Sequence, residues 1–510
     1  MKNAKKFNKL KKFWLNINCE DRSGFNFFSF GLIVIYSLLV AFGIYHHEPW
    51  RDEAQAWLIA RDLNFFGIIN QMCYEGTPAL WHLIIAPFAK AGLPYFSINI
   101  IHLVISIGGI SVFVIKSDFS KLFKILFIFS YYLAYEYAVV ARNYSLTILF
   151  LFLIASMYEK RFEKPIVFSV LIFFLFNTNV FGAIIAFAIS SLFVFESLNI
   201  FKSKKIYFIS WLIILLSFIF LVFQLIPPDA NIISSVFTYC NYIAPAKMFT
   251  NAFIPLRFYH HSIYTFLFFT LLVLVFCISL IKKPKLIFLI SITFSGFIYV
   301  FVFKHGGYHR HHAMILVFMI YILWIQKYYK NNYSIIKFIP FNEVLNKNIS
   351  VLRNIFYGIL MLCLSYSVVY SFNTYYKELK YNFSGAKDMG DFIKNDDFDD
   401  YEIAAFSVFR AIAVIPYINQ KSIWYVQTNR MGSFGTWDKH TLNKTNASIE
   451  SLIKRTENKL LINKKVLVLV SDTTELEQLV NFELIYETSH KDFWIDGETV
   501  SENYWLYKPL

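Results

Sequence analysis

Long apolar runs separated by short polar segments dominate the first three quarters of the chain. A helix needs about 20 residues to cross a bilayer, or about 17 at the short end. Runs of this size predict membrane-spanning helices near residues 25–45, 79–116, 121–140, 142–158, 164–177, 180–200, 206–226, 262–281, 285–303, 312–329 and 350–372. The run 79–116 has room for two short helices broken at Gly92-Leu93-Pro94, so the pattern predicts about 11 to 13 crossings.

The pattern changes after residue 375, where long apolar runs stop and charged residues become frequent. Residues 466–470 form a short β-branched run that is typical of a buried strand, and 401–407 and 422–426 look similar. Helical spacing appears at 385–394, 447–457 and 474–480. We therefore expect residues 376–510 to form a small soluble α/β domain, of ordinary domain size, behind a membrane domain at 25–375.

Composition agrees with a polytopic membrane protein. The chain is 57% hydrophobic, 20% aromatic and only 16% charged, against about 25% charged residues in typical soluble domains. The net charge of +14 lies mainly in short loops between apolar runs, where the positive-inside rule places Lys and Arg. This distribution argues against a nucleic-acid partner and favours membrane lipids. The five cysteines lack the spacing of a zinc site or a disulfide framework.

The basic loops also predict the orientation in a bacterial-type inner (cytoplasmic) membrane. The basic tail 1–24 and the lysine-rich loops after several runs should face the cytoplasm. Alternation then places an acidic loop at 46–77, a longer loop at 227–261 and the C-terminal domain outside the cytoplasm. The first apolar run has no small-residue cleavage site, so it reads as an uncleaved helix.

The acidic loop is the most informative stretch, because ionisable groups beside a bilayer are costly and often functional. Trp50, Ala54, Trp57 and Leu58 form an apolar stripe on a helix that starts at Pro49. Such a helix would lie flat in the membrane interface, with its tryptophans at headgroup depth. Its first turn would hold Asp52 and Glu53, where the helix dipole favours ionised carboxylates.

Two interpretations of these acids remain open on chemistry alone. A carboxylate facing the headgroups is able to accept the proton of a hydroxyl that attacks a lipid-linked phosphate ester. The alternative is a solvated loop whose acids only cap a helix.

Four short segments follow one another along the membrane domain: Asp52-Glu53-Ala54, Pro78-Ala79-Leu80-Trp81, Ala141-Arg142-Asn143-Tyr144-Ser145-Leu146 and Tyr308-His309-Arg310-His311. In this order they resemble the GT-C superfamily of integral-membrane glycosyltransferases, in its protein O-mannosyltransferase-like branch, which includes the lipid A aminoarabinose transferases. The resemblance covers roughly residues 25–372.

The resemblance implies a polyprenyl-phosphate sugar as donor and the first acid of the pair, Asp52, as catalytic base. It places Glu53 beside Asp52, shaping the acceptor site or holding a divalent metal; we assign no cofactor and no metal ligands. Tyr74 and Glu75, at the end of the acidic loop, become candidate substrate-binding residues. Many members have Lys or His before the re-entry proline, where this chain has Thr77, so other cations must meet the donor phosphate.

The segment from Lys304 to His312 offers such cations. Lys304, His309 and Arg310 are candidates for the donor phosphate, since Arg forms bidentate bonds to phosphate oxygens. The alternative is that these side chains only snorkel to the interface. Arg142 is a further candidate, which pairs either with Glu136 or with substrate.

The sequence and this resemblance thus predict an inverting glycosyltransferase that acts at the outer face of the cytoplasmic membrane. It would move a sugar from a polyprenyl phosphate to a hydroxyl of a lipid, glycan or protein. A transporter or flippase of polyprenyl-linked saccharides is the alternative, although no inverted pair of broken helices, which often marks secondary transporters, is apparent.

Overall fold

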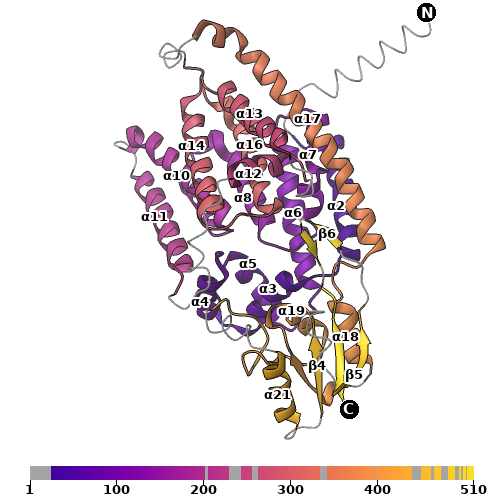
Figure 1. Ribbon diagram of the computed structural model, residues 1–510. Coiled ribbons are helices and arrows are strands. Elements are labelled where there is room, and N and C mark those ends of the chain that lie inside the picture. The colour runs from indigo at the N-terminus through magenta and orange to yellow at the C-terminus, as the bar shows by residue number, and fades with distance from the viewer. Residues whose placement is uncertain are drawn as a thin grey trace, which may run out of the picture.

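The computed structural model describes residues 24–201, 205–228, 243–255, 262–332, 342–396, 398–438, 449–460, 465–471, 481–488, 493–495, 498–500 and 502–510. A helical bundle forms the upper part of the molecule in Figure 1, and a small sheet lies at its lower end. The helices before the sheet are α2 (Phe27–His46), α3 (Arg51–Asp62), α4 (Phe65–Glu75), α5 (Leu80–Lys90), α6 (Ser97–Lys116), α7 (Lys121–Ile128), α8 (Tyr144–Met157), α9 (Pro165–Phe176), α10 (Val180–Phe201), α11 (Ile206–Leu225), α12 (Ala244–Phe253), α13 (Ile263–Ser279), α14 (Pro284–Phe303), α15 (His309–His312), α16 (Met314–Ile325) and α17 (Asn342–Lys380).

The bundle confirms the predicted class of polytopic helical membrane protein. Within the described residues, six helices are long and apolar enough to cross a bilayer. They are Phe27–His46, Ser97–Lys116, Val180–Leu198, Ile206–Leu225, Pro284–Phe303 and Asn348–Lys380. Shorter apolar helices, such as α5, α9 and α13, fill other predicted runs. The larger number of crossings, and the side on which each terminus lies, stay predictions.

Two predicted runs are interrupted, for different reasons. The run 79–116 divides into α5 and α6 around Gly92, whose φ of +74° a side chain would rarely adopt. In the run 121–140, α7 ends at Ile128 and a π-helical turn follows at Tyr132–Glu136. Here the backbone N–H of Tyr131 donates to Ser367 Oγ (3.0 Å) of α17 instead of continuing a helix ladder.

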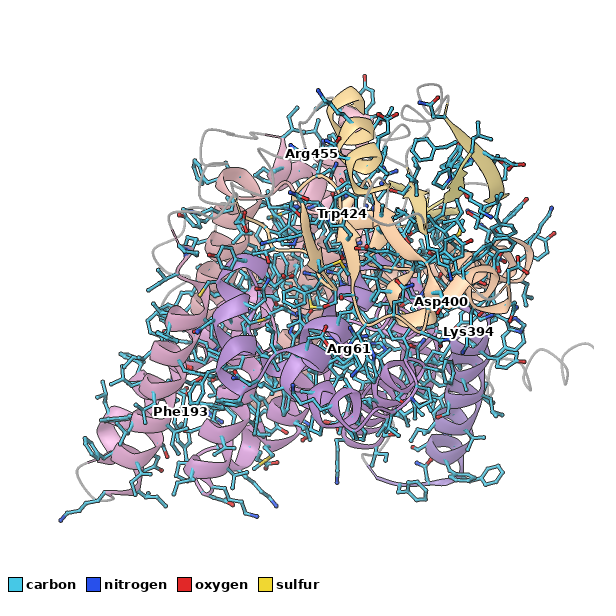
Figure 2. All side chains as sticks on the ribbon, turned by 90° about the horizontal axis from the view of Figure 1, so that it is seen from below. Arg61, Phe193, Lys394, Asp400, Trp424 and Arg455 are labelled. Atoms are coloured by element: carbon cyan, nitrogen blue, oxygen red, sulfur yellow. The ribbon has the colours of Figure 1, made fainter. Side chains whose placement is uncertain are left out.

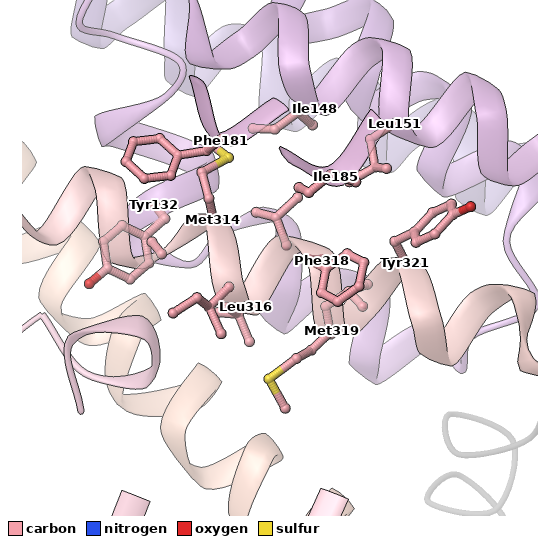
Figure 3. Close-up of a cluster of buried hydrophobic side chains, with 14 of the residues drawn as sticks. Tyr132, Ile148, Leu151, Phe181, Ile185, Met314, Leu316, Phe318, Met319 and Tyr321 are labelled. Carbon is pink, nitrogen blue, oxygen red and sulfur yellow. The ribbon is translucent and has the colours of Figure 1, made fainter. Parts of the chain in front are cut away.

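Helix α16 forms the centre of the bundle. All of its residues are buried, as expected for a helix that is apolar on every side. Figure 3 shows Met314, Leu316 and Phe318 of this helix among side chains from neighbouring helices, including Ile148 and Ile185. The helices around α16 therefore pack against a core of fully buried apolar side chains.

The C-terminal sheet follows α17 and has six strands in the order β3-β2-β1-β4-β8-β5. Its strands are β1 (Glu402–Ala405), β2 (Ile423–Tyr425), β3 (Arg430–Gly432), β4 (Val466–Val470), β5 (Phe482–Glu487) and β8 (Trp505–Pro509), with a separate hairpin of β6 (Phe493–Ile495) and β7 (Glu498–Val500). Strand β1 runs parallel to β2 and β4, and the remaining pairs are antiparallel.

Helices α18 (Ala386–Asn395), α19 (Val408–Ala411) and α21 (Ile449–Leu460) complete the C-terminal part. The strands predicted at 401–407, 422–426 and 466–470 correspond to β1, β2 and β4, and two of the predicted helices to α18 and α21. The predicted helix 474–480 lies outside the described residues, as do the tail 1–23 and most of the loop 227–261.

Candidate active site

Helix α3 lies between the bundle and the C-terminal sheet (Figure 1). Alternate residues of β1 and β4, such as Ile403 and Leu467, belong to the same buried cluster as Ala54, Trp57 and Leu58. The prediction that this stripe rests in the membrane interface was therefore wrong: the stripe is covered by protein. Helix α3 packs mainly against α5, and α19 and the 3-10 turn Ile415–Tyr417 of the C-terminal part also contact it. Burial against these segments removes the same apolar surface from water that contact with lipid would have removed.

Polar contacts attach α3 firmly to the C-terminal part. The side chain of Gln55 pairs with the backbone of Gly435, donating to its carbonyl (2.7 Å) and accepting from its N–H (2.9 Å). Arg61 donates to the carbonyl of Lys421 (2.6 Å), and Figure 2 shows Arg61 beside the elements that carry Trp424. Loops of the C-terminal part next to β2 and β3 therefore help to hold the helix that bears the acidic pair.

Helix α3 begins at Arg51, with Trp50 as its N-cap. This start is two residues later than predicted, and it leaves Asp52 in the first turn. The Asp52 side chain is 30% exposed, and its Oδ2 accepts a hydrogen bond from Arg142 Nη1 at 2.5 Å. Burial tends to raise the pKa of Asp52, but the positive charges of Arg142, Arg310 and Arg51 outweigh it and lower the pKa below its ordinary value.

Arg142 pairs with Asp52 across 90 residues of sequence. Pairing with Glu136, the structural option for this arginine, is not what the structure shows. Glu136 accepts a hydrogen bond from Tyr131 Oη (2.8 Å) inside the bundle. The Arg142 side chain remains 26% exposed. Part of its guanidinium side chain is therefore accessible to a ligand beside the Asp52 carboxylate.

Glu53 occupies a very different environment from that of its neighbour. It is fully buried, and both of its carboxylate oxygens are engaged. Oε1 accepts from the N–H of Ala141 (2.7 Å), and Oε2 accepts from the N–H of Trp50 (3.1 Å) and contacts His47 Nε2 (3.1 Å). In this arrangement protein groups bind both carboxylate oxygens of Glu53, and neither oxygen is exposed.

Glu75 lies at the end of α4, where its Oε1 accepts from the amides of Gln55 (2.9 Å) and Gln71 (3.0 Å). Burial raises the pKa of Glu75 to about 7, so this carboxyl changes charge near neutral pH. The adjacent Tyr74 is partly exposed. Thr77, in the position where many members of the resembled family have a cation, binds the amide of Asn143 (2.8 Å).

The segment 304–312 divides between the site and the bundle. The Arg310 guanidinium lies over the rings of Tyr308 (4.8 Å) and Trp50 (5.9 Å), which brings it to the start of α3 near Asp52. Lys304 instead lies over Tyr299 (5.7 Å), as the snorkelling alternative describes. His309 is buried. Of the candidate cations, Arg142 and Arg310 are therefore the two that the fold brings to Asp52.

The backbone that carries Arg310 turns at Gly307, which has a φ of +75°. A Cβ there would lie 2.6 Å from His312 Nε2, and that ring bonds to Asn251 Nδ2 and to the carbonyl of Gly306, both at 3.0 Å. We predict that Gly307→Ala destabilises the protein by about 1–3 kcal/mol, as measured by thermal unfolding. It should also lower the rate of sugar transfer. Gly358→Ala in α17, where a Cβ meets nothing within 4 Å, is the control and should not destabilise.

Two further residues of this neighbourhood, Glu502 and Gln55, carry no signal in the sequence. Glu502, which precedes β8, accepts from Ser384 Oγ (2.8 Å) and lies 3.8 Å from Arg51 Nε. Burial raises the pKa of Glu502 to about 7. No local pattern marks Glu502 or Gln55 as part of the site, since their partners lie in other parts of the chain. Among the described residues no group of three or more His, Cys, Asp or Glu is arranged to hold a metal.

Comparison of the sequence with protein-family models and with curated proteins gives no match. Comparison of the fold with solved structures gives a match to the crystal structure of ArnT from Cupriavidus metallidurans bound to undecaprenyl phosphate. The alignment has a TM-score of 0.50 and covers 93% of this chain and 97% of ArnT. The chain has the ArnT fold. The two sequences are 10% identical, so the likeness concerns architecture, from the helical bundle to the C-terminal sheet.

Proposed function

We propose that the chain is a membrane glycosyltransferase of the GT-C type that takes its sugar from a polyprenyl-phosphate donor. The observation that carries the proposal is the pair of Asp52 and Arg142, partly exposed at the start of α3, with Arg310 close by. These three residues combine a carboxylate able to accept a proton with two guanidiniums able to bind a phosphate. ArnT, which shares the fold, was crystallised with undecaprenyl phosphate, the kind of lipid carrier that the proposal requires.

The proposed reaction is a single displacement. The oxygen of an acceptor hydroxyl forms a bond to the anomeric carbon of the sugar, and its proton passes to the Asp52 carboxylate. The bond between the anomeric carbon and the phosphate oxygen breaks, and the polyprenyl phosphate leaves with the electron pair. Attack from the side opposite the phosphate inverts the anomeric centre.

The arginines have two roles in this proposal. Arg142 and Arg310 stabilise the negative charge that develops on the leaving phosphate, which is where fixed charges contribute most to rate. They also keep Asp52 ionised before the donor binds. A donor phosphate that binds these guanidiniums draws their charge away from Asp52, so its pKa rises and it becomes a stronger base.

Orientation and acceptor are parts of the same proposal. The proposal puts Asp52 and the C-terminal sheet on the outer face of an inner membrane, with the N-terminus in the cytoplasm, and the positive-inside distribution of the loop charges supports this orientation. Phe65 and Phe66 of α4 are 54% and 74% exposed, and they suit contact with the bilayer surface beside the site. The acceptor would be a hydroxyl of a lipid, glycan or protein.

The proposal predicts a missing sugar in cells without the gene. Mass spectrometry of lipids, glycans and glycoproteins from cells with and without it should show one sugar mass lost from one class of molecule. The purified protein with a polyprenyl-phosphate sugar should restore that mass to the isolated acceptor. Movement of a labelled lipid-linked sugar across vesicles without transfer to any acceptor would instead support the flippase and overturn this proposal.

A further inference from the structure

Three ionisable side chains from distant parts of the sequence form a buried triad behind the candidate site. His47 Nε2 lies 3.1 Å from Glu53 Oε2, and His47 Nδ1 lies 2.8 Å from Glu378 Oε1. The side chains are at most 1% exposed. The residues come from the α2–α3 connection, α3 and the end of α17, and 331 positions of sequence separate His47 from Glu378.

The triad is joined to the candidate site through the two oxygens of Glu53. Oε1 accepts from the N–H of Ala141, which directly precedes Arg142, and Oε2 accepts from the N–H of Trp50, two residues before Asp52. One carboxylate thereby connects the backbone that carries Arg142 to the backbone that carries Asp52. His47 fixes that carboxylate from behind and links it to Glu378.

We propose that His47, Glu53 and Glu378 are positioning residues that set the distance between Asp52 and Arg142. The inference rests on the proposed function, since its consequence is the alignment of a base with a phosphate-binding cation. None of the three touches a reacting atom. A displacement of about 1 Å in such a site can cost about a hundredfold in rate, so a rigid connection between the two segments has a large effect.

The triad needs a positive charge at its centre. Two carboxylates buried side by side would repel each other, and an imidazolium between them offsets both charges. The groups that face His47 are Glu53 of α3, Glu378 of α17, Tyr135 of the π-helical turn, whose hydroxyl donates to Glu378, and His102 of α6.

Burial tends to lower the pKa of His47, but the two carboxylates outweigh it and raise the pKa to about 10. Because the folded-state pKa lies above the ordinary value of 6.5, the stabilisation is complete below pH 6.5. It is lost progressively as the pH rises through the folded-state pKa. The triad should therefore hold the site together at neutral pH and release it in alkali.

Glu378→Gln and His47→Gln test the proposal in the full-length purified protein. Glu378→Gln keeps the shape of the side chain but removes one carboxylate from His47, so the alkaline limit of kcat should move down by about one pH unit or more. His47→Gln should lower kcat at pH 7 by about tenfold or more, with a much smaller change in KM for the donor. Glu196→Gln is the matched control, because the Glu196 side chain is only 4% exposed but pairs with Arg161 and Lys285 elsewhere.

The outcomes separate this inference from the proposed function. An unchanged alkaline limit in Glu378→Gln, or an unchanged kcat in His47→Gln, would overturn the positioning role while leaving the transferase intact. A wild-type protein that transfers no sugar would overturn both the proposed function and the role assigned here. Thermal unfolding from pH 6 to 10 tests the triad itself: wild type should lose stability with rising pH, and Glu378→Gln should lose it at lower pH. Should His47→Gln fail to fold, the Glu378→Gln profile decides the matter.

Discussion

Replacing Asp52 with Asn is expected to abolish sugar transfer, lowering kcat by about 10²–10⁴-fold. Asparagine has nearly the same shape, but its amide cannot accept the proton of an acceptor hydroxyl at neutral pH. Arg142 Nη1 donates to Asp52 Oδ2 at 2.5 Å, and the amide oxygen of Asn can still accept that bond. Donor binding should therefore survive while transfer is lost. The measurement is the rate of transfer from a polyprenyl-phosphate sugar, together with the affinity for undecaprenyl phosphate.

Asp62→Asn provides the matched control for Asp52→Asn. Asp62 ends the same helix and pairs with Arg61, with 29% of its side chain exposed. A partly exposed pair of this kind contributes about 0–1 kcal/mol, so the control should keep a near wild-type rate. Wild-type activity in Asp52→Asn, with insertion and thermal stability unchanged, would mean that another group accepts the proton.

The second large effect is expected at Arg142. Arg142→Gln removes a charge-assisted hydrogen bond to the donor phosphate, and such a bond is worth about 1.5–3 kcal/mol, which corresponds to roughly 10- to 150-fold in donor affinity. The same change removes the leading positive charge beside Asp52. The pKa of Asp52 should rise, and the acidic limit of activity should move to higher pH, because an aspartate must be ionised to accept a proton.

These two consequences of Arg142→Gln are measured separately. Direct binding of undecaprenyl phosphate reports the lost contact, and the rate profile between pH 4 and 8 reports the shifted Asp52. Arg353→Gln, at an exposed position of α17, removes an equal charge far from α3 and should change neither. Binding as tight as in wild type, with an unmoved acidic limit, would exclude Arg142 from the donor site and leave Arg310 and Arg51 as the cations beside Asp52.

Several features were predictable from the sequence because they depend on local patterns. Long apolar runs indicated helices such as α6 and α14, and the β-branched run at 466–470 indicated β4. Gly92 broke the long run into α5 and α6, since a positive φ is a property of the residue itself. The acidic pair stood out for the same reason, because carboxylates next to an apolar run are costly wherever the chain folds.

The partners of these residues could not be read in the same way. An apolar stripe specifies that Trp57 and Leu58 must leave water, but lipid and protein satisfy it equally. Only the packing of α3 against α5 and against α19 of the C-terminal part decided in favour of protein. Lys304 and Arg310 are alike in the sequence, yet α14 directs one to Tyr299 and α15 directs the other to Trp50.

The sequence by itself thus determined that this is a helical membrane protein with a terminal sheet, and that an acidic pair precedes the second apolar run at 79–116. These features follow from hydrophobic periodicity and charge, which act over a few residues. Only the tertiary structure decided that Asp52 meets Arg142 and that Glu53 turns inward to His47. The two carboxylates are neighbours in the chain, but a helix points them in different directions. Their environments are then set by residues that are tens to hundreds of positions away, which no local pattern specifies.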